Sequence, residues 1–505
     1  MSARPLMIQG TASTCGKSLI TSALCRILNQ DGFRVAPFKA QNMSNNSFVT
    51  RDGLEMGRAQ VVQAIAAGID PDVRMNPVLI KPSSDTGAQV VLNGKPAFTM
   101  DAKNWHGTRE RLRTEIRNAW ESIVSEYEII ILEGAGSPAE INLKKNDVVN
   151  MGMAAMADAP VILVGDIDRG GVFASLVGTM QLLNDNEQKR VKGFIINKFR
   201  GDPGLLTSGL EQLEKLTGVP VLGVVPWIDH SIDDEDGVSD RFDHTRPEQG
   251  CIDICIIRLP HISNFTDFIP LEAIPGVKIR WCDRANNFGT PDLCIIPGSK
   301  ATITDLRRLK QEGIADVIIN YAHSGGTILG ICGGFQMLGR EITDTDATES
   351  VNQREAGLGL LEMQTRFLPE KTTLQTTATL HGEASWLFSG GGKKMIAGYE
   401  IHHGESTFAP AMQTFTSSVS SDGSSRITGI ASSSGRVLGS YLHGLFDSGE
   451  VTSAMVNALL RQKDLEILED SVSDRRNTLD HELDRLAESV RNNCDMDAIR
   501  RILQV

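Results

Sequence analysis

The sequence predicts an α/β fold with mostly parallel sheets, divided into two domains and a C-terminal extension. Three observations lead to this prediction. Short apolar runs alternate with helical patterns along most of the chain, which is typical of parallel strands covered by helices on both faces. The 505 residues exceed what one hydrophobic core normally fills. Glycine-rich turns follow two of the apolar runs, one near residue 10 and one near residue 332.

The first series of elements should form one parallel sheet. Strands are expected at residues 5–9, 33–36, 128–132, 160–164, 193–197 and 219–223, and helices at 17–30, 57–67 and 108–125. Residues 1–228 therefore make up the first predicted domain. The acidic segment 229–250 is expected to be a solvated linker, because a run of charges more often faces water than holds a cation.

The second series begins after the linker and predicts a second domain at residues 251–450. Strands are expected at 252–257, 292–298, 326–330 and 438–443, and the Gly-rich and Ser-rich segments 389–392 and 416–425 are expected to be loops. Residues 451–505 form a helical extension. Within it an apolar stripe has helical spacing, and we expect it to pack on the second domain. The stripe consists of Leu479, Leu483, Leu486 and Val490.

Charge and composition exclude several classes of partner for this protein. The formal net charge of −13 gives no long-range attraction to nucleic acid or to anionic membranes. The eight cysteines form no C-x₂-C pairs, which favours reduced thiols over a disulfide framework. No apolar run reaches membrane-spanning length, and Met1 to Gln9 is too short and too polar for a secretory signal. We therefore expect a cytoplasmic protein that acts on small molecules.

The first glycine-rich turn has the composition of a phosphate-binding loop. The segment Gly10-Thr-Ala-Ser-Thr-Cys-Gly-Lys-Ser18 follows an apolar strand and opens a helical pattern. Such a turn surrounds a triphosphate with backbone N–H groups, while its Lys contacts the terminal phosphates and its Ser contacts Mg²⁺. The loop is one residue longer than the common form, and in this it is similar to dethiobiotin synthetase-like ATPases. The expected ATP-binding residues are Gly10, Thr14, Gly16, Lys17 and Ser18.

Further polar residues should gather at the same edge of the sheet. Glu133 follows the strand predicted at 128–132 and is a candidate second Mg²⁺ ligand, with helix capping as the alternative. Three loop-like segments carry cations and amides suited to the carboxylates and amides of a polar substrate, with a solvated loop as the alternative for each. The candidate substrate-binding residues are Lys39, Gln41, Asn42, Arg58 and Lys81.

The second glycine-rich turn predicts a cysteine nucleophile. Cys332 lies in Gly330-Ile-Cys-Gly-Gly334 after an apolar strand, where a tight turn presents its side chain above a sheet. A buried, inert cysteine is the alternative. Gly333 and Gly298 are expected to supply backbone N–H groups to an oxyanion.

A base should accompany such a nucleophile. His443 follows a predicted strand and is succeeded by a glycine, which leaves its ring accessible, so it is the favoured candidate. His402 and His403 compete with it, and the spacing excludes neither.

On these residues the chain resembles the cobyric acid synthase family, the glutamine-dependent amidotransferases of adenosylcobalamin synthesis. The resemblance covers nearly the whole chain. Ordinary class I glutaminases carry His-x-Glu, whereas here Leu445 stands two places after His443; the family shares that departure, and the third member of the triad stays open. The most specific segments are Phe38 to Ser47, Glu55 to Gln60, Met75 to Pro82, Leu132 to Asn142, Asp166 to Phe173, Leu259 to Asp267 and Gly398 to His402.

The resemblance implies a dethiobiotin synthetase-like P-loop domain that acts as an ATP-dependent amidoligase, followed by a class I-like glutamine amidotransferase domain. It implies that Cys332 and His443 release ammonia from glutamine through a glutamyl thioester. ATP and Mg²⁺ would serve to phosphorylate a carboxylate of a corrinoid acid, and ammonia would displace the phosphate. In the family these steps amidate the b, d, e and g carboxylates of adenosylcobyrinic acid a,c-diamide.

Two other functions stay open at this point. Cobyrinic acid a,c-diamide synthase shares both domains and the chemistry, although segments 39–47 and 75–82 resemble the cobyric acid branch more closely. A P-loop ATPase switch with an inert glutaminase-like domain is the alternative from another class. The intact turn at Gly330 to Gly334 and the lack of a membrane-targeting helix argue against it.

Overall fold

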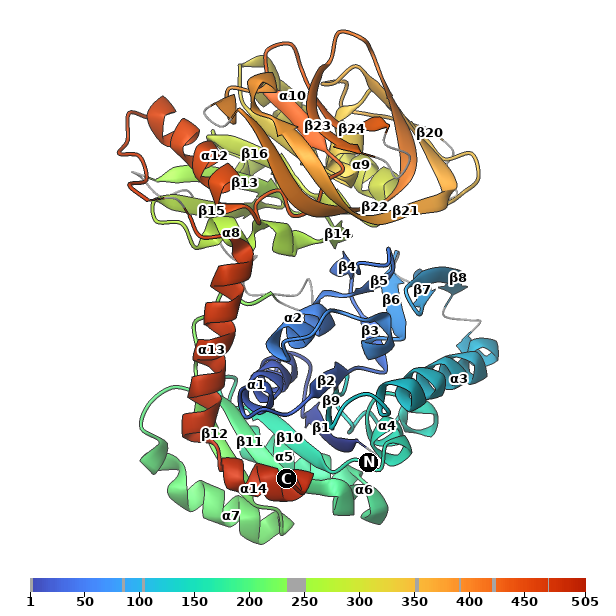
Figure 1. Ribbon diagram of the computed structural model, residues 1–505, viewed down its shortest axis with the longest axis vertical. Helices are drawn as coiled ribbons and strands as arrows, with labels where there is room; N and C mark the ends of the chain where they lie inside the picture. The colour runs from blue at the N-terminus through green and yellow to red at the C-terminus, as the bar shows by residue number, and fades with distance from the viewer. Residues whose placement is uncertain are drawn as a thin grey trace.

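The computed structural model describes residues 3–83, 87–101, 105–233, 251–349, 354–389, 392–419, 424–470 and 472–505 (Figure 1). Within these residues lie two large hydrophobic cores. The first joins residues 3–232 to residues 479–503, and the second is built from residues 252–460. The predicted α/β fold with one sheet-containing domain after the other is confirmed.

The first domain is built on a sheet with strand order β12-β11-β10-β1-β9-β2, in which every neighbouring pair is parallel. Its central strands are continuous apolar runs because helices cover both faces. The strands are β1 (Arg4–Gly10), β2 (Val35–Phe38), β9 (Ile129–Glu133), β10 (Val161–Asp166), β11 (Val191–Phe199) and β12 (Val221–Pro226). The helices are α1 (Lys17–Gln30), α2 (Arg58–Ala66), α3 (Trp105–Ile123), α4 (Met151–Met156), α5 (Val172–Leu182), α6 (Asp185–Arg190) and α7 (Thr207–Thr217).

Small strands follow β2 and lie on the side of the first domain that faces the second domain (Figure 1). They form one mixed sheet with order β3-β6-β7-β8 and a separate antiparallel pair, β4 with β5. The strands are β3 (Gln41–Met43), β4 (Ser47–Val49), β5 (Glu55–Gly57), β6 (Val78–Pro82), β7 (Gly87–Leu92) and β8 (Lys95–Asp101). Three segments expected to be loop-like contribute to these strands, because strands of three residues leave little periodicity to read.

The second domain has a sheet with order β15-β13-β16-β18-β25-β24-β23-β21-β19-β20, and β22 also pairs with β21. The part from β15 to β25 is parallel, and the pairs from β25 to β21 are antiparallel. The strands are β13 (Ile252–Ile257), β15 (Val277–Cys282), β16 (Leu293–Ile296), β18 (Ile328–Ile331), β19 (Glu341–Thr343), β20 (Arg354–Ala356), β21 (Met363–His381), β22 (Lys393–Phe408), β23 (Gln413–Val419), β24 (Ser425–Ala431) and β25 (Val437–Ser440). The helices are α8 (Ile269–Glu272), α9 (Thr302–Gln311), α10 (Ile314–His323), α11 (Gly333–Leu338) and α12 (Gly449–Gln462), and β14 (Ile262–Ser263) pairs with β17 (Gly298–Ser299).

The C-terminal helices correct one expectation. The apolar stripe lies on α13 (Arg475–Asn493), which packs against α1 and β12 of the first domain and not on the second domain (Figure 1). The following helix, α14 (Met496–Leu503), joins the same core. By contrast, α12 packs in the second core. The last two helices of the extension, α13 and α14, therefore pack in the same hydrophobic core as the first domain.

The acidic segment expected to be a linker lies mostly at residues 234–250, outside the described residues. Asp233, at its described start, is buried between two guanidinium groups, those of Arg58 and Arg475. No helix in the described part of the chain has both the length and the apolar character needed to cross a membrane.

Candidate active sites

The phosphate-binding loop lies between β1 and α1, as expected. Gly16 has a φ of 101°, which favours glycine, and a Cβ there would lie 2.0 Å from Asn197 Nδ2. That same nitrogen donates to the Cys15 carbonyl at 3.0 Å and so braces the loop. Lys17 Nζ donates to the carbonyls of Ala12 at 2.9 Å and Gly136 at 3.2 Å, which folds its ammonium over the turn.

Glu133 ends β9 beside this loop, because β9 is the parallel neighbour of β1. Its carboxylate is buried and accepts hydrogen bonds from Ser18 Oγ at 2.8 Å and from Lys39 Nζ at 2.9 Å. Gln63 Nε2 donates to its other oxygen. Ser18 and Glu133 thus offer two adjacent oxygen donors at the N-terminus of α1, the chemistry that Mg²⁺ prefers.

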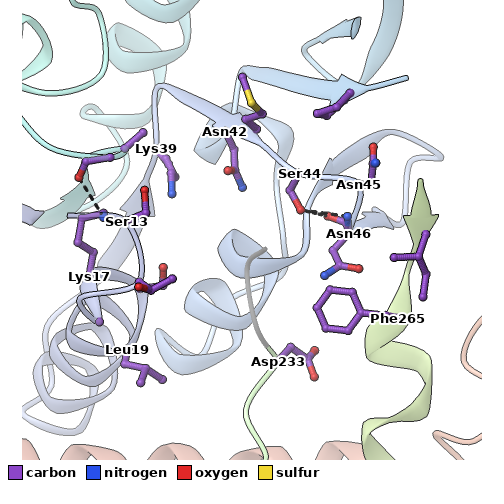
Figure 2. Close-up of a pocket in the computed structure, with 18 of the residues that line it drawn as sticks. Ser13, Lys17, Leu19, Lys39, Asn42, Ser44, Asn45, Asn46, Asp233 and Phe265 are labelled. Atoms are coloured by element: carbon purple, nitrogen blue, oxygen red, sulfur yellow. Dashed lines mark hydrogen bonds between the residues drawn. The ribbon is translucent and has the colours of Figure 1, made fainter. Parts of the chain in front are cut away.

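A cavity of about 1910 Å³ begins at the phosphate-binding loop and reaches the second domain. One wall is the segment from Lys39 to Asn46, seen along the top of Figure 2. Lys39, Gln41 and Asn42 belong to this wall, so three of the five candidate substrate-binding residues line the cavity. The second domain contributes Arg258, Phe265, Trp281 and Arg284.

The other two candidate substrate-binding residues do not line this cavity, because buried carboxylates hold their charges. Arg58 Nε lies 2.6 Å from Asp233 Oδ2. Lys81 Nζ lies 2.6 Å from Glu55 Oε1 and donates to Ser47 Oγ at 2.9 Å. A sequence motif reveals that a cation is present, but not which carboxylate neutralises it.

The second site forms where β18 meets α11. Cys332 has a φ of 50° and a ψ of −109°, a strained conformation of the kind found where a strand turns sharply into a helix to present a nucleophile. Its Sγ is buried and lies 3.6 Å from the Ile401 carbonyl. A Cβ on Gly333 would lie 2.8 Å from the Ser299 nitrogen, so the segment that begins at Gly298 packs directly against this turn.

His443 is the histidine whose surroundings fit a base for Cys332. Its Nδ1 lies 2.6 Å from Asp267 Oδ2, and its Nε2 has no partner among the described residues. Burial of the ring would lower the pKa of His443, but the Asp267 carboxylate and the Cys332 sulfur outweigh burial and raise it to about 10. A protonated ring beside a sulfur can act as a general acid.

Asp267 therefore occupies the third position that the sequence left open. It lies in the segment Leu259 to Asp267, on the short helical turn that follows β14. Sequence reasoning missed its role because no pattern connects it to His443. The segment itself was a signal, since it was one of the most specific parts of the resemblance.

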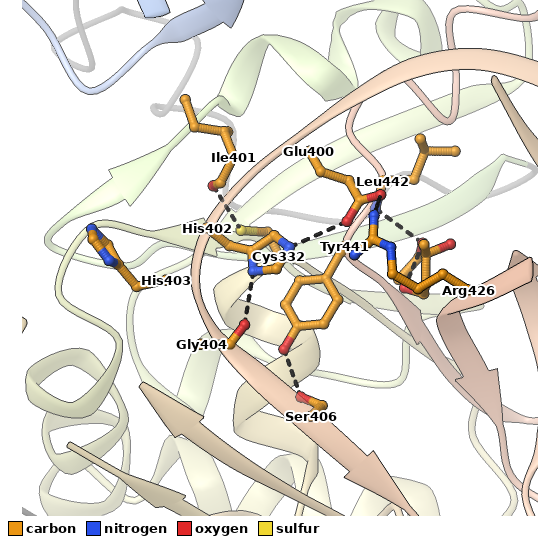
Figure 3. Close-up of polar contacts among 12 residues, drawn as sticks. Cys332, Glu400, Ile401, His402, His403, Gly404, Ser406, Arg426, Tyr441 and Leu442 are labelled. Atoms are coloured by element: carbon orange, nitrogen blue, oxygen red, sulfur yellow. Dashed lines mark hydrogen bonds and ion pairs between the residues drawn. The ribbon is translucent and has the colours of Figure 1, made fainter. Parts of the chain in front are cut away.

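The competing histidines are held in other ways (Figure 3). His402 contacts Glu400 Oε2 through Nε2 at 3.2 Å and the Gly404 carbonyl through Nδ1 at 3.1 Å, so both ring nitrogens are engaged. For His403, burial and the charges of Lys300 and Lys371 lower the pKa to about 3. Neither ring combines a carboxylate on one nitrogen with a second nitrogen left open, as His443 does.

Comparisons with known proteins agree with this geometry. Residues 6–237 match the family model described as CobQ/CobB/MinD/ParA nucleotide binding domain. Residues 253–451 match the CobB/CobQ-like glutamine amidotransferase domain. A cobyric acid synthase of Salmonella heidelberg (strain SL476) is 51% identical over 503 residues, covering 99% of this chain and 98% of that protein. The cobyric acid synthase of Salmonella typhimurium (strain LT2) is 51% identical over 506 residues, with the same coverage. The chain belongs to the cobyric acid synthase family.

Proposed function

We propose that this protein is a glutamine-hydrolysing, ATP-dependent amidoligase that converts the b, d, e and g carboxylates of adenosylcobyrinic acid a,c-diamide into amides. The observation that carries the proposal is the 51% identity over 99% of the chain to proteins named cobyric acid synthase. The two sites described above supply the residues that this chemistry needs. A cytoplasmic location is part of the same proposal.

Cys332 and His443 carry out the glutaminase half of the reaction. The Cys332 thiolate attacks the side-chain carbonyl carbon of glutamine, and the backbone around Gly333 and Gly298 stabilises the oxyanion. His443 donates its proton to the leaving nitrogen, and ammonia departs. Water then hydrolyses the glutamyl thioester, with His443 accepting a proton from it. Asp267 holds the ring through Nδ1, which leaves Nε2 for these proton transfers.

The phosphate-binding loop serves the ligase half. Gly10, Thr14 and Gly16 shape the loop around ATP, and Lys17 contacts the terminal phosphates. A carboxylate oxygen of the corrinoid attacks the γ-phosphorus, ADP leaves, and an acyl phosphate forms. Ammonia attacks its carbonyl carbon and phosphate departs, which leaves the amide. The segment containing Lys39, Gln41 and Asn42 binds polar groups of the corrinoid.

A Mg²⁺ ion fits the oxygen donors of Ser18 and Glu133, whose contacting atoms lie 2.8 Å apart beside the loop. When bound there, the ion would neutralise charge on the phosphates. Lys39, which is 2.9 Å from the same Glu133 oxygen, holds this carboxylate in place.

Product analysis by mass spectrometry tests the proposal. With adenosylcobyrinic acid a,c-diamide, ATP and glutamine, we expect four successive conversions of carboxyl to amide. The intermediates should appear free in solution, because one ATP site must serve side chains that point in different directions. Amidation restricted to the a and c groups of cobyrinic acid would instead assign the protein to the sister activity.

Two variants separate the halves of the reaction. Cys332→Ala should abolish amidation from glutamine but keep amidation from added ammonium salts, because the thiol only generates ammonia. Lys17→Ala should abolish both, since both nitrogen donors need the activated carboxylate. Equal loss of both activities in Cys332→Ala would contradict this division of labour.

A further inference from the structure

The glutaminase site lies directly against the ligase domain. Strand β4 packs on β22, where Val49 forms a small buried cluster with Tyr399 and Ile401. Phe48 meets the Tyr399 ring edge to face, with centroids 5.2 Å apart. Ile401 is also the residue whose carbonyl lies against Cys332 Sγ. A strand of the ligase domain therefore supports the segment that borders the nucleophile.

Asn264 connects the two domains by its side chain. Its Nδ2 donates to the Ser47 carbonyl at 2.7 Å and to the Tyr399 hydroxyl at 2.7 Å. The residue is 2% exposed and has a φ of 52° and a ψ of 38°, a left-handed conformation that Asn adopts more readily than most residues. One N–H of this buried amide is bonded across the interface, to Ser47, and the other is bonded within its own domain, to Tyr399, so the contact is specific and not general packing.

The same residue reaches both partners of the catalytic pair. Tyr399 stacks on the His443 ring, with centroids 5.1 Å apart and planes at 15°. Their backbones also exchange hydrogen bonds, from Tyr399 N to His443 O at 3.2 Å and from His443 N to Tyr399 O at 2.9 Å. The Asn264 carbonyl accepts from the Asp267 nitrogen at 3.0 Å and so fixes the turn that carries the carboxylate. Asn264 thereby orients His443 from one side and Asp267 from the other.

The contact between Asn264 and Ser47 also lies next to the large cavity. The lining segment ends at Asn46, one residue before Ser47, and Phe265 follows Asn264 directly (Figure 2). A molecule bound against this segment therefore acts on the backbone whose carbonyl holds the Asn264 amide.

We propose that Asn264 is a positioning residue that makes glutamine hydrolysis depend on the occupant of the ligase cavity. The inference rests on the proposed function and adds its regulation. When the corrinoid orders the segment before Ser47, the Ser47–Asn264–Tyr399 contact holds His443 and Asp267 in their working geometry. When the cavity is empty, the segment moves more freely and hydrolysis slows, so ammonia is released mainly when a carboxylate awaits it.

The test compares glutamine hydrolysis with and without adenosylcobyrinic acid a,c-diamide and ATP. Asn264→Gly keeps the left-handed conformation and removes the amide, and Tyr399→Phe removes only the hydroxyl. Gln375→Ala is the matched control, because the Gln375 side chain also donates across the interface, from Nε2 to the Val49 carbonyl at 2.8 Å. The backbone of Gln375 lies opposite Tyr399 in the β21–β22 ladder, and the substitution keeps that backbone pairing. Amidation from ammonium salts is measured in each variant.

In the unmodified protein we expect the substrates to stimulate hydrolysis. In Asn264→Gly and Tyr399→Phe the stimulation should fall to nearly nothing. Their kcat should drop about tenfold, the size expected for one buried hydrogen bond, with the KM for glutamine unchanged. Ammonia-driven amidation should persist, and Gln375→Ala should behave as the unmodified protein.

Three results would overturn the inference. The substrates could stimulate glutamine hydrolysis in Asn264→Gly as much as in the unmodified protein, or Gln375→Ala could lose the stimulation equally. The unmodified protein could also hydrolyse glutamine at the same rate with and without the corrinoid. None of these affects the proposed function as long as amides form. A protein that forms no amide from either nitrogen donor would instead refute the proposed function.

Discussion

Asp267 and His443 form a direct contact, 2.6 Å between Oδ2 and Nδ1, although they are 176 positions apart in the chain. The carboxylate comes from the turn after β14 and the imidazole from the segment after β25. The imidazole comes close to Cys332 because β25 is a parallel neighbour of β18, the strand that precedes Cys332. The carboxylate joins them because β14 pairs with β17, which directly follows β16, the other neighbour of β18. In the proposed function, this contact takes the place of the glutamate that ordinary class I glutaminases carry two residues after their histidine.

Asp267→Asn should lower glutamine hydrolysis by roughly 10²–10⁴-fold, the contribution typical of general acid–base catalysis. The amide has nearly the same shape, but it neither holds the ring in the correct tautomer nor stabilises its charge. Steady-state kinetics with glutamine measures the loss. Amidation from ammonium salts is the control and should be retained. A variant with full glutaminase activity would show that Asp267 is not the third member of the triad.

The same contact predicts how stability depends on pH. His443 has a folded-state pKa of about 10 against an ordinary value of 6.5. Its stabilising contribution is therefore fully present below pH 6.5 and is lost as the pH rises towards 10. The thermal unfolding temperature of the unmodified protein should exceed that of Asp267→Asn most below pH 6.5, with the gap closing towards pH 10. A gap that widened with rising pH would contradict the assignment.

The tight turns of the two candidate sites could be predicted from sequence because the glycines that they need are local. The residues from Gly10 to Ser18 and the turn around Cys332 each need glycines within a few positions, and that requirement is visible in the chain. Asp267 was not predictable as a partner of His443, since only the folded chain brings them together.

The packing of the helix at Arg475–Asn493 is a second feature that could not be predicted from sequence. Its stripe showed that one face is buried, but the choice of core was decided by contacts far from it in the sequence. Arg26 of α1 pairs with Asp480 and Asp484 on this helix. The helical spacing of apolar residues does not show which other element the helix will contact.

Glu133→Gln tests the metal site. The substitution keeps the size of the side chain but removes the charge beside Ser18 and Lys39. We expect amidation from glutamine and from ammonium salts to fall equally, by about 10²-fold, because both need the activated carboxylate. The Mg²⁺ concentration for half-maximal activity should rise, by roughly 10–100-fold. A Mg²⁺ titration of ammonia-driven amidation measures this, and an unchanged requirement would place the ion on other residues.

Glu55→Gln should destabilise the junction between the domains. Glu55 is 1% exposed and accepts from Lys81 Nζ at 2.6 Å within its own domain and from Lys371 Nζ at 2.6 Å across the interface. Burial would raise the pKa of Glu55, but the two ammonium groups hold it well below its usual range. Without the carboxylate, two buried cations face each other unpaired, at a cost of about 3–5 kcal/mol.

Chemical denaturation at pH 7 measures this loss, and Lys371→Met is the matched control because it leaves the pair of Glu55 with Lys81 intact. Its destabilisation should be the smaller of the two. Since the pKa of Glu55 is lowered on folding, its contribution is present above its ordinary value of 4.5 and is lost as the pH falls below that value. The unmodified protein and Glu55→Gln should therefore converge in stability on acidification, whereas a difference that stayed constant down to low pH would mean that this carboxylate is not ionised in the folded protein.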